Sequence, residues 1–200
     1  MVRPGPTGAP RGRPRSERVR LAVLDAAADL LVEGGMSAAT IEGIAARAGV
    51  SKATIYKWWP TRGHVALDSF FTRTRDTIAV DPGASLADSL TVQLQALCAL
   101  FRDTASGRLM RELAAFAQND PDVRDALEEH WLRPRRAVAM RLLTEAAERG
   151  ELRADIDVEA VVDQLFAPVY HRLLFGHAPL REGLAAALVG QLLTGLRPRN

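Results

Sequence analysis

Residues 51–60, SKATIYKWWP, bring two lysines, two small hydroxyl side chains and three aromatic rings into one short stretch. The ammonium groups of Lys52 and Lys57 can bind phosphates, and Lys52 can also reach a guanine edge. Thr54 offers a hydroxyl to a base or a phosphate and a methyl group to thymine. Tyr56 can donate to a phosphate. This combination indicates contact with a nucleic acid, and the alternative for each residue is an ordinary exposed polar side chain.

Two helices joined by a tight turn must position these side chains. Thr40 suits the N-cap of a first helix and Ser51 that of a second, because their hydroxyls can accept hydrogen bonds from backbone N–H groups. Residues 48–50, Ala-Gly-Val, predict a turn, since glycine tolerates a left-handed conformation. Pro60 ends the second helix, because proline disfavours helix at the preceding residue. The spacing predicts a helix-turn-helix over about residues 40–59, with two helices of about eight residues.

The aromatic side chains of the second helix divide between its faces. Ile55 and Trp59 are four residues apart, so they share a face that should pack on the preceding helices. Trp59 is therefore expected in the core, and Tyr56 on the outward, lysine-bearing side. Trp58 is left with two roles: its indole N–H can donate to a phosphate, or its ring only covers the domain surface.

Helical periodicity extends over most of the chain, and no run alternates convincingly at period two. Residues 1–15 are rich in Pro, Gly and Arg and are expected to be disordered. The first helix is expected to begin after Ser16 as N-cap and to end at Gly34 or Gly35. Further helices are predicted over roughly 61–78, with Thr61 as a cap, and over 85–103, 107–118, 121–149, 157–175 and 180–196. The sequence predicts an all-α protein of about nine helices.

Composition and charge exclude several classes. The single Cys98 leaves no internal disulfide and no Cys-based metal site, which is typical of a reducing cytoplasm. No apolar run reaches about 18 residues and the N-terminus lacks the apolar core of a secretion signal, so neither a membrane span nor export is expected. Residues 1–64 carry ten Lys or Arg and five Asp or Glu, whereas the remainder carries 16 and 19. This asymmetry indicates either a polyanionic partner or a solvated basic tail.

The stretch TIEGIAARAGVSKATIYKWWPTRGHV, residues 40–65, resembles the TetR family of bacterial transcriptional regulators. The match extends over about residues 17–65, including a first helix that ends in Gly-Gly. Over residues 66–200 only the all-helical architecture is similar. The chain departs from the family pattern at Trp58 and Trp59, where Tyr or His and then a Phe-like residue are usual.

The resemblance implies a division of the chain. Residues 1–15 would be a disordered basic arm, residues 16–64 a three-helix DNA-binding domain, and residues 65–200 a larger helical body for effector binding and dimerisation. It further implies a homodimer that binds a palindromic operator in double-stranded DNA, represses transcription and is released by a small-molecule effector. The helix over 61–78 would carry the effector signal to the DNA-binding domain.

A recognition helix enters the major groove by its N-terminal residues, so a first turn of small or flexible side chains lets the backbone approach the bases. Arg62 stands where the family usually has a phosphate-binding lysine, and its guanidinium adds a bidentate fork. Its neighbour Gly63 weakens the helix start. The resemblance, together with the chemistry above, predicts DNA contacts by Thr40, Ser51, Lys52, Ala53, Thr54, Tyr56, Lys57, Trp58 and Arg62.

The arm contains RGRPR at residues 11–15, which resembles the core of an AT-hook. Narrow A·T minor grooves attract arginine, so Arg13 and Arg15 are predicted to enter one. The alternative is a nonspecific phosphate tether.

Large apolar side chains and one histidine on the stripes of the body are candidates for an effector pocket. They are Phe101, Met110, Phe116, Trp131, Met140, Phe166, Tyr170 and His171. For each, a core or interface position is the alternative. The histidines of the chain show no metal-ligand spacing, and neither a metal nor a cofactor is expected.

The helices over 157–175 and 180–196 carry wide apolar faces. They are predicted to pair with their copies in a four-helix, two-fold interface, and ordinary core is the alternative. Pro168 is expected to kink the first of them or to mark a shifted boundary.

Enzymatic chemistry has no clear carrier in the sequence. No Gly-rich phosphate loop follows a strand, and no paired carboxylates or activated nucleophile stand out, so the chain is not expected to be an enzyme. An activator, or a protein-interaction adaptor with a residual helix-turn-helix, is the alternative to a repressor.

Overall fold

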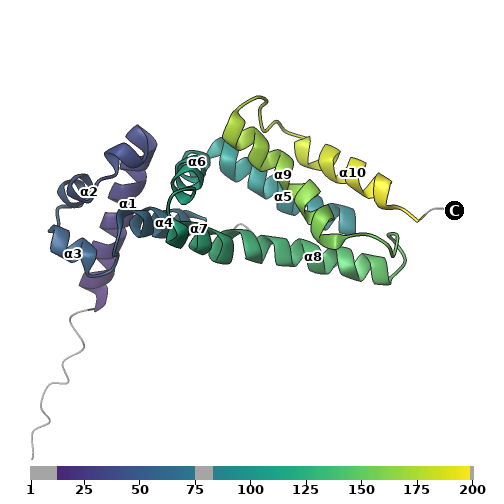
Figure 1. The fold of residues 1–200 in the computed structure, drawn as a ribbon, viewed down its shortest axis with the longest axis horizontal. Coiled ribbons are helices and arrows are strands. Elements are labelled where there is room, and N and C mark those ends of the chain that lie inside the picture. The colour runs from purple at the N-terminus through teal and green to yellow at the C-terminus, as the bar shows by residue number, and fades with distance from the viewer. Residues whose placement is uncertain (1–12, 75–82, 199–200) are drawn as a thin grey trace, which may run out of the picture. The chain divides into compact units, whose positions relative to one another are not determined.

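The computed structural model describes residues 13–74 and 83–198, and within these ranges the chain forms helices and connecting turns without a strand (Figure 1). The all-α prediction is confirmed. The chain divides into two compact units, residues 1–69 and residues 70–200, so that the division lies inside one helix. The sequence placed it slightly earlier, between residues 64 and 65.

The first unit is built on α1 (Arg13–Ala38), against which α2 (Ile41–Ala48) packs. The short α3 (Lys52–Tyr56) follows α2, and α4 (Arg62–Arg73) leads into the second unit. Fully or almost fully buried side chains from all four helices form the core: Val23, Ala27, Leu31, Ile44, Ile55, Val65 and Leu67. The predicted helix-turn-helix pair is therefore held by a small apolar core.

The start of α1 differs from the prediction. The helix begins at Arg13, so Ser16 lies inside it rather than at its N-cap, and residues 13–15 are helical where disorder was expected. Pro14 does not prevent this, because proline is tolerated in the first turn, where its missing N–H has no helical partner. The rest of the predicted arm, residues 1–12, lies outside the described residues.

The predicted stop at the two glycines is confirmed. Gly34 (φ −146°, ψ 20°) and Gly35 (φ 67°, ψ −162°) leave helical geometry, and a short helical turn to Ala38 follows them. The positive φ of Gly35 is accessible to glycine at little cost.

The second unit begins within α4 and continues with α5 (Leu86–Asp103) and α6 (Ser106–Ala117). A long run follows without interruption: α7 (Pro121–Leu127), the π-helical turn η1 (Glu128–Leu132) and α8 (Arg133–Glu148). This run matches the single helix predicted over 121–149. The far end of the helix predicted over 61–78 falls partly outside the described residues.

The π turn inserts one wider turn into this run. The backbone N–H of Arg133 donates to the carbonyl of Glu128, five residues back, instead of four. Trp131 lies in this turn and is 1% exposed. A one-residue π insertion is frequent at functional positions and was not visible in the apolar pattern.

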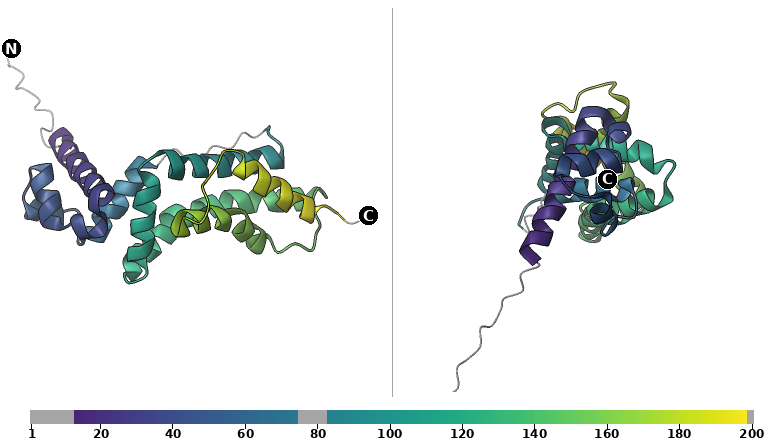
Figure 2. Two further views of the ribbon diagram at one scale, coloured as in Figure 1. Left: turned by 90° about the horizontal axis from the view of Figure 1, so that it is seen from above. Right: turned by 90° about the vertical axis from the view of Figure 1, so that its left-hand side faces the viewer.

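The last two helices are α9 (Val158–Phe175) and α10 (Leu184–Leu196), which pack on each other and on α5 (Figures 1 and 2). α9 continues through Pro168, so the proline does not shift its boundary. α10 begins later than the predicted residue 180, because Gly183 at its N-cap takes a left-handed conformation (φ 77°).

Candidate functional site

The N-caps of the helix-turn-helix are as predicted. The Thr40 hydroxyl accepts from the backbone N–H of Gly43 at 3.0 Å, and the Ser51 hydroxyl accepts from that of Thr54 at 3.2 Å. Gly49 adopts the left-handed conformation (φ 66°) that ends α2 and makes the turn. These caps fix the N-termini of both helices, where free N–H groups and the helix dipole favour phosphate.

α3 is shorter than the predicted helix of about eight residues. It ends at Tyr56, and the chain tightens after it, because the backbone N–H groups of Trp58 and Trp59 both donate to the carbonyl of Ile55, each at 3.0 Å. These two bonds form a turn that leads to the buried Trp59, the residue directly before Pro60.

The division of the faces is confirmed. Ile55 is fully buried and Trp59 is 3% exposed, whereas Tyr56 is 54% exposed. The Trp59 indole N–H donates to Oδ2 of Asp68 at 2.9 Å, which ties the turn after α3 to α4. Trp58 is half-buried and packs edge-on against Trp59 at 5.6 Å between ring centroids.

The outer side of α3 carries side chains that the sequence analysis predicted to contact DNA. Ser51, Lys52, Ala53 and Lys57 are exposed, and Thr54 is half-buried with its hydroxyl 2.9 Å from that of Ser51. The structure thus gathers small, hydroxylic and basic side chains on one solvent-facing surface. Of the side chains of Arg13 and Arg15 nothing is described, so their predicted minor-groove contact stays a prediction.

Lys52 has an intramolecular partner that sequence reasoning missed. Its Nζ lies 3.0 Å from Oε1 of Glu42, in the first turn of α2, and both side chains are solvent-exposed. The hydrogen bond lowers the pKa of the Glu42 carboxyl and raises that of Lys52. The sequence feature that could have indicated this pair is the acidic Glu42 in the first turn of the preceding helix.

Arg62 is likewise tied to the protein. Its Nη1 donates to the carbonyl of Met36 at 3.1 Å, which links the start of α4 to the last turn of α1. Thr61 precedes it and accepts from the backbone N–H of His64 at 3.4 Å, as its predicted capping role requires. Arg62 therefore supports the local fold, and its predicted phosphate contact remains a prediction.

The candidate pocket residues of the body differ in how deeply they are buried. Phe101, Met110, Trp131 and Phe166 are buried, whereas Phe116 and Met140 are half-buried. His171 is exposed, with its ring 4.4 Å from that of His177 and 5.0 Å from that of Phe175.

A polar cluster lies inside the body. The Trp131 indole N–H donates to the Tyr170 hydroxyl at 2.8 Å, and the ring of Phe101 packs edge-on against that of Tyr170 at 5.7 Å. Burial raises the pKa of Tyr170 to about 12, so the phenol keeps its proton at neutral pH.

Arg135 belongs to the same cluster and was not selected from the sequence. It is 7% exposed, its guanidinium carbon lies 3.3 Å from the centroid of the Trp131 ring, and its Nη1 donates to the Trp131 carbonyl at 3.1 Å. Burial lowers its pKa to about 10, which still leaves it charged at neutral pH. Gln93 donates to the Arg135 carbonyl at 3.2 Å, and its own buried Oε1 has no hydrogen-bond partner among the described residues.

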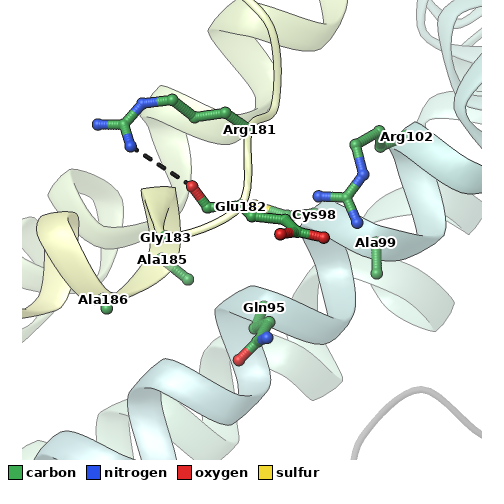
Figure 3. Close-up of a pocket in the computed structure, with 9 residues that line it drawn as sticks. All are labelled: Gln95, Cys98, Ala99, Arg102, Arg181, Glu182, Gly183, Ala185 and Ala186. Atoms are coloured by element: carbon green, nitrogen blue, oxygen red, sulfur yellow. Dashed lines mark hydrogen bonds between the residues drawn. The ribbon is translucent and has the colours of Figure 1, made fainter.

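One cavity of the body, of about 470 Å³, lies between α5 and the segment that leads into α10 (Figure 3). Two of its charged side chains bind protein atoms: Arg102 pairs with Asp103 and donates to the carbonyl of Leu180 at 3.1 Å, and Arg181 donates to the carbonyl of Glu182 at 3.4 Å. Cys98 also lines it, and burial raises the pKa of the thiol, which keeps it neutral.

Neither a membrane-spanning helix nor a metal-binding cluster is found among the residues that the structure describes. None of the helices in that part of the chain is both long and apolar enough to cross a membrane. The same residues include no group of three or more His, Cys, Asp or Glu side chains that could hold a metal ion.

Comparison with known families gives two matches. Residues 23–67 match the model described as bacterial regulatory proteins, tetR family. Residues 80–192 match the model of a tetracyclin repressor-like C-terminal domain. The first match contains the helix-turn-helix and the second contains most of the body.

Individual relatives agree with these matches. The HTH-type transcriptional regulator YdeS of Bacillus subtilis is 37% identical over 94% of both chains. The DNA-binding transcriptional repressor TetR of Mycobacteroides abscessus is 29% identical over 92% of this chain and 97% of its own. The crystal structure of the TetR family transcription regulator SCO0332 superposes with a TM-score of 0.69 at 40% identity, and covers 90% of this chain and 100% of that one.

Proposed function

Since the chain belongs to the TetR family of bacterial transcriptional regulators, we propose that it is a repressor that binds a palindromic operator as a homodimer and leaves it when a small molecule binds the body. The observation that carries this proposal is the outer surface of α3. Lys52 and Lys57 extend from it beside the exposed ring of Tyr56, over a buried Ile55 and Trp59.

Each part of this surface has a role in the proposed complex. The first turn of α3 enters the major groove, where Ala53 leaves room and Thr54 contacts a base edge. Tyr56 and Lys57 bind phosphates and set the orientation of the helix. The capped N-terminus of α2, at Thr40, binds a phosphate of the flanking backbone through its N–H groups.

The homodimer forms through α9 and α10 in this proposal. Small side chains on the outer side of α10 support it, because Ala186 and Gly190 are exposed and a Cβ added at Gly190 would meet nothing within 4 Å. Small residues let two helices approach closely across a two-fold axis. Replacing Gly190 by Arg should therefore leave the protomer folded and shift the protein from dimer to monomer in analytical ultracentrifugation. An unchanged dimer would place the interface elsewhere.

The effector acts on α4 in the proposed mechanism. The chain passes from the first unit to the second between Ser69 and Phe70. Ser69 donates to the carbonyl of Leu24 at 2.9 Å, and the Phe70 ring packs edge-on against Trp131 at 4.6 Å. A ligand that moves the Trp131 cluster would therefore act directly on the helix that leads to the DNA-binding domain, with a coupling typically of about 1–3 kcal/mol.

The test is a mobility-shift and footprinting experiment on DNA upstream of the gene and its neighbours, in a salt series. A dimeric regulator should protect two half-sites about one helical turn, or a compatible multiple, apart. Lys57→Ala should weaken binding and make the salt dependence shallower, by about 0.9 in slope for each phosphate that is no longer neutralised. Arg124→Ala, which removes an exposed charge from α7 in the second unit, is the matched control. Binding without sequence preference would favour an adaptor instead.

A further inference from the structure

A second cavity of the body lies between α9 and the junction of η1 with α8. Its volume is about 320 Å³, which is within the range of small-molecule sites. Its lining residues are Leu132, Arg135, Arg136, Asp163, Phe166, Ala167 and Tyr170. All of them belong to the second unit, so the site is defined by that unit alone.

The lining combines an apolar wall with an excess of positive charge. Leu132, Phe166 and Ala167 supply the apolar surface, and two arginines face one aspartate. The carboxylate of Asp163 forms an ion pair with Arg136, which also lies 3.7 Å from Glu159. Two carboxylates thus hold Arg136 at the rim, while the second guanidinium of the lining is buried.

Arg135 supplies this buried charge in a fixed orientation. Its stacking on Trp131 and its bond to the Trp131 carbonyl leave it little rotational freedom. A guanidinium presents five N–H donors in a fork that matches a carboxylate. An anion in the cavity would meet a pre-oriented donor and would lose little entropy in ordering it.

Tyr170 adds a second donor to the same wall. Its oxygen accepts the Trp131 N–H, and a phenol that accepts one bond keeps its own O–H to donate. Arg135 and Tyr170 both line this cavity, and each of them contacts Trp131. A carboxylate could therefore accept from both.

We propose that this cavity binds an organic anion, a carboxylate with a short apolar body. The carboxylate accepts from Arg135 and Tyr170, and the apolar body lies along Leu132, Phe166 and Ala167. Binding in the cavity follows from these residues alone. That the bound anion is also the effector rests on the proposed function.

The test is isothermal titration calorimetry of the full chain with octanoate, and with octan-1-ol as an uncharged probe of the same length. Octanoate should bind in a saturable manner. The affinity for octan-1-ol should be lower by at least about tenfold, because the alcohol lacks the charge-assisted hydrogen bonds. Equal binding of the two probes, or no binding of octanoate, would overturn the proposal.

Two variants of the rim make a matched pair. Arg136→Gln and Asp163→Asn both remove the same ion pair, but they change the charge of the cavity in opposite directions. Octanoate should therefore bind more weakly to R136Q and more tightly to D163N than to the unaltered protein. A change in the same direction in both variants would mean that the ion pair acts only on the fold, and would refute the anion site.

Operator binding with and without octanoate separates the two levels of the proposal. Release of DNA by octanoate, with the R136Q and D163N variants shifted in opposite directions, supports an effector role. If octanoate binds in calorimetry but does not change operator affinity, the anion site is supported and its role as the effector site is overturned. A chain that binds octanoate but no DNA would refute the proposed function and leave the cavity assignment standing.

Discussion

The ammonium group of Lys52, at the first position of α3, is held 3.0 Å from the carboxylate of Glu42 on α2. The residue best placed to reach a base edge thus carries an acidic companion on the same exposed surface. In the proposed complex, a DNA phosphate or base would have to displace the Glu42 carboxylate before it could bind Lys52. In the proposed complex, Glu42 would therefore oppose DNA binding both by holding Lys52 and by its own negative charge.

The first prediction concerns this pair. Glu42→Gln should strengthen operator binding by a few-fold, because Lys52 is released and a carboxylate is removed from the vicinity of the phosphates. Fluorescence anisotropy with a labelled operator measures the change. Glu33→Gln is the control, since Glu33 forms a comparable exposed pair with Arg47 on another part of the unit. Unchanged affinity in Glu42→Gln would mean that Lys52 does not contact DNA.

The second prediction separates the two faces of α3. Trp59→Ala should destabilise the protein by about 3–5 kcal/mol, because it removes a buried ring and its bond to Asp68. Urea denaturation followed by circular dichroism measures the loss. Trp58→Ala should cost clearly less, since that ring is only half-buried.

Tyr56→Phe gives the third prediction. The exposed hydroxyl is expected to donate to a phosphate, so the variant should bind the operator more weakly and unfold at the same urea concentration. If Tyr56→Phe binds DNA normally, the phosphate contact is absent and the helix is oriented differently on the duplex.

The fourth prediction concerns the close packing of Gly107 in α6 against the end of α5. A Cβ at Gly107 would lie 2.1 Å from the backbone carbonyl oxygen of Phe101, which cannot move as a side chain can. Gly107→Ala should therefore destabilise the fold, by about 1–3 kcal/mol or more. Gly195→Ala in α10 meets nothing within 4 Å and serves as the control for adding the same methyl group. Equal stability of the two variants would show that α6 shifts without cost.

The fifth prediction is a titration of Tyr170. In the Tyr56→Phe variant it is the remaining tyrosine, and its ultraviolet absorbance should report ionisation at about pH 12 in the folded protein. In concentrated urea the midpoint should fall towards the ordinary value of 10.0. Because the folded state retains the proton that the unfolded state releases, this group's contribution to stability is complete below pH 10 and is lost as the pH rises through about 12.

The local order of the DNA-binding domain could be predicted because its signals are local. A capping hydroxyl at Thr40 or Ser51, a glycine at the turn and a four-residue spacing between Ile55 and Trp59 each act within a few residues. The Lys52–Glu42 pair joins two helices, and no pattern within one helix reveals it. The early end of α3 also escaped prediction, and it is accompanied by two hydrogen bonds to the carbonyl of Ile55.

The body was harder to predict for the same reason. Apolar spacing identified Trp131 and Tyr170 but could not distinguish a pocket wall from ordinary core. Arg135 was missed altogether, since an arginine in a helical pattern is normally assigned to the surface. Its burial depends on stacking against Trp131 and on the width of the turn before it, and both belong to the assembled structure.

The π turn η1 also makes this segment sensitive to the deletion of a single residue. The buried positions Val123, Leu127, Trp131, Ala139 and Leu143 fall at multiples of four residues, a spacing that drifts by about 40° per step around a regular α-helix. The π turn takes up part of this drift because it contains one extra residue. Deleting a single codon within 128–132 would restore a regular helix and rotate α7 against α8 by about 100°. A substitution at an exposed position of this segment leaves the helix register unchanged, whereas the loss of one residue would displace the buried ring of Trp131.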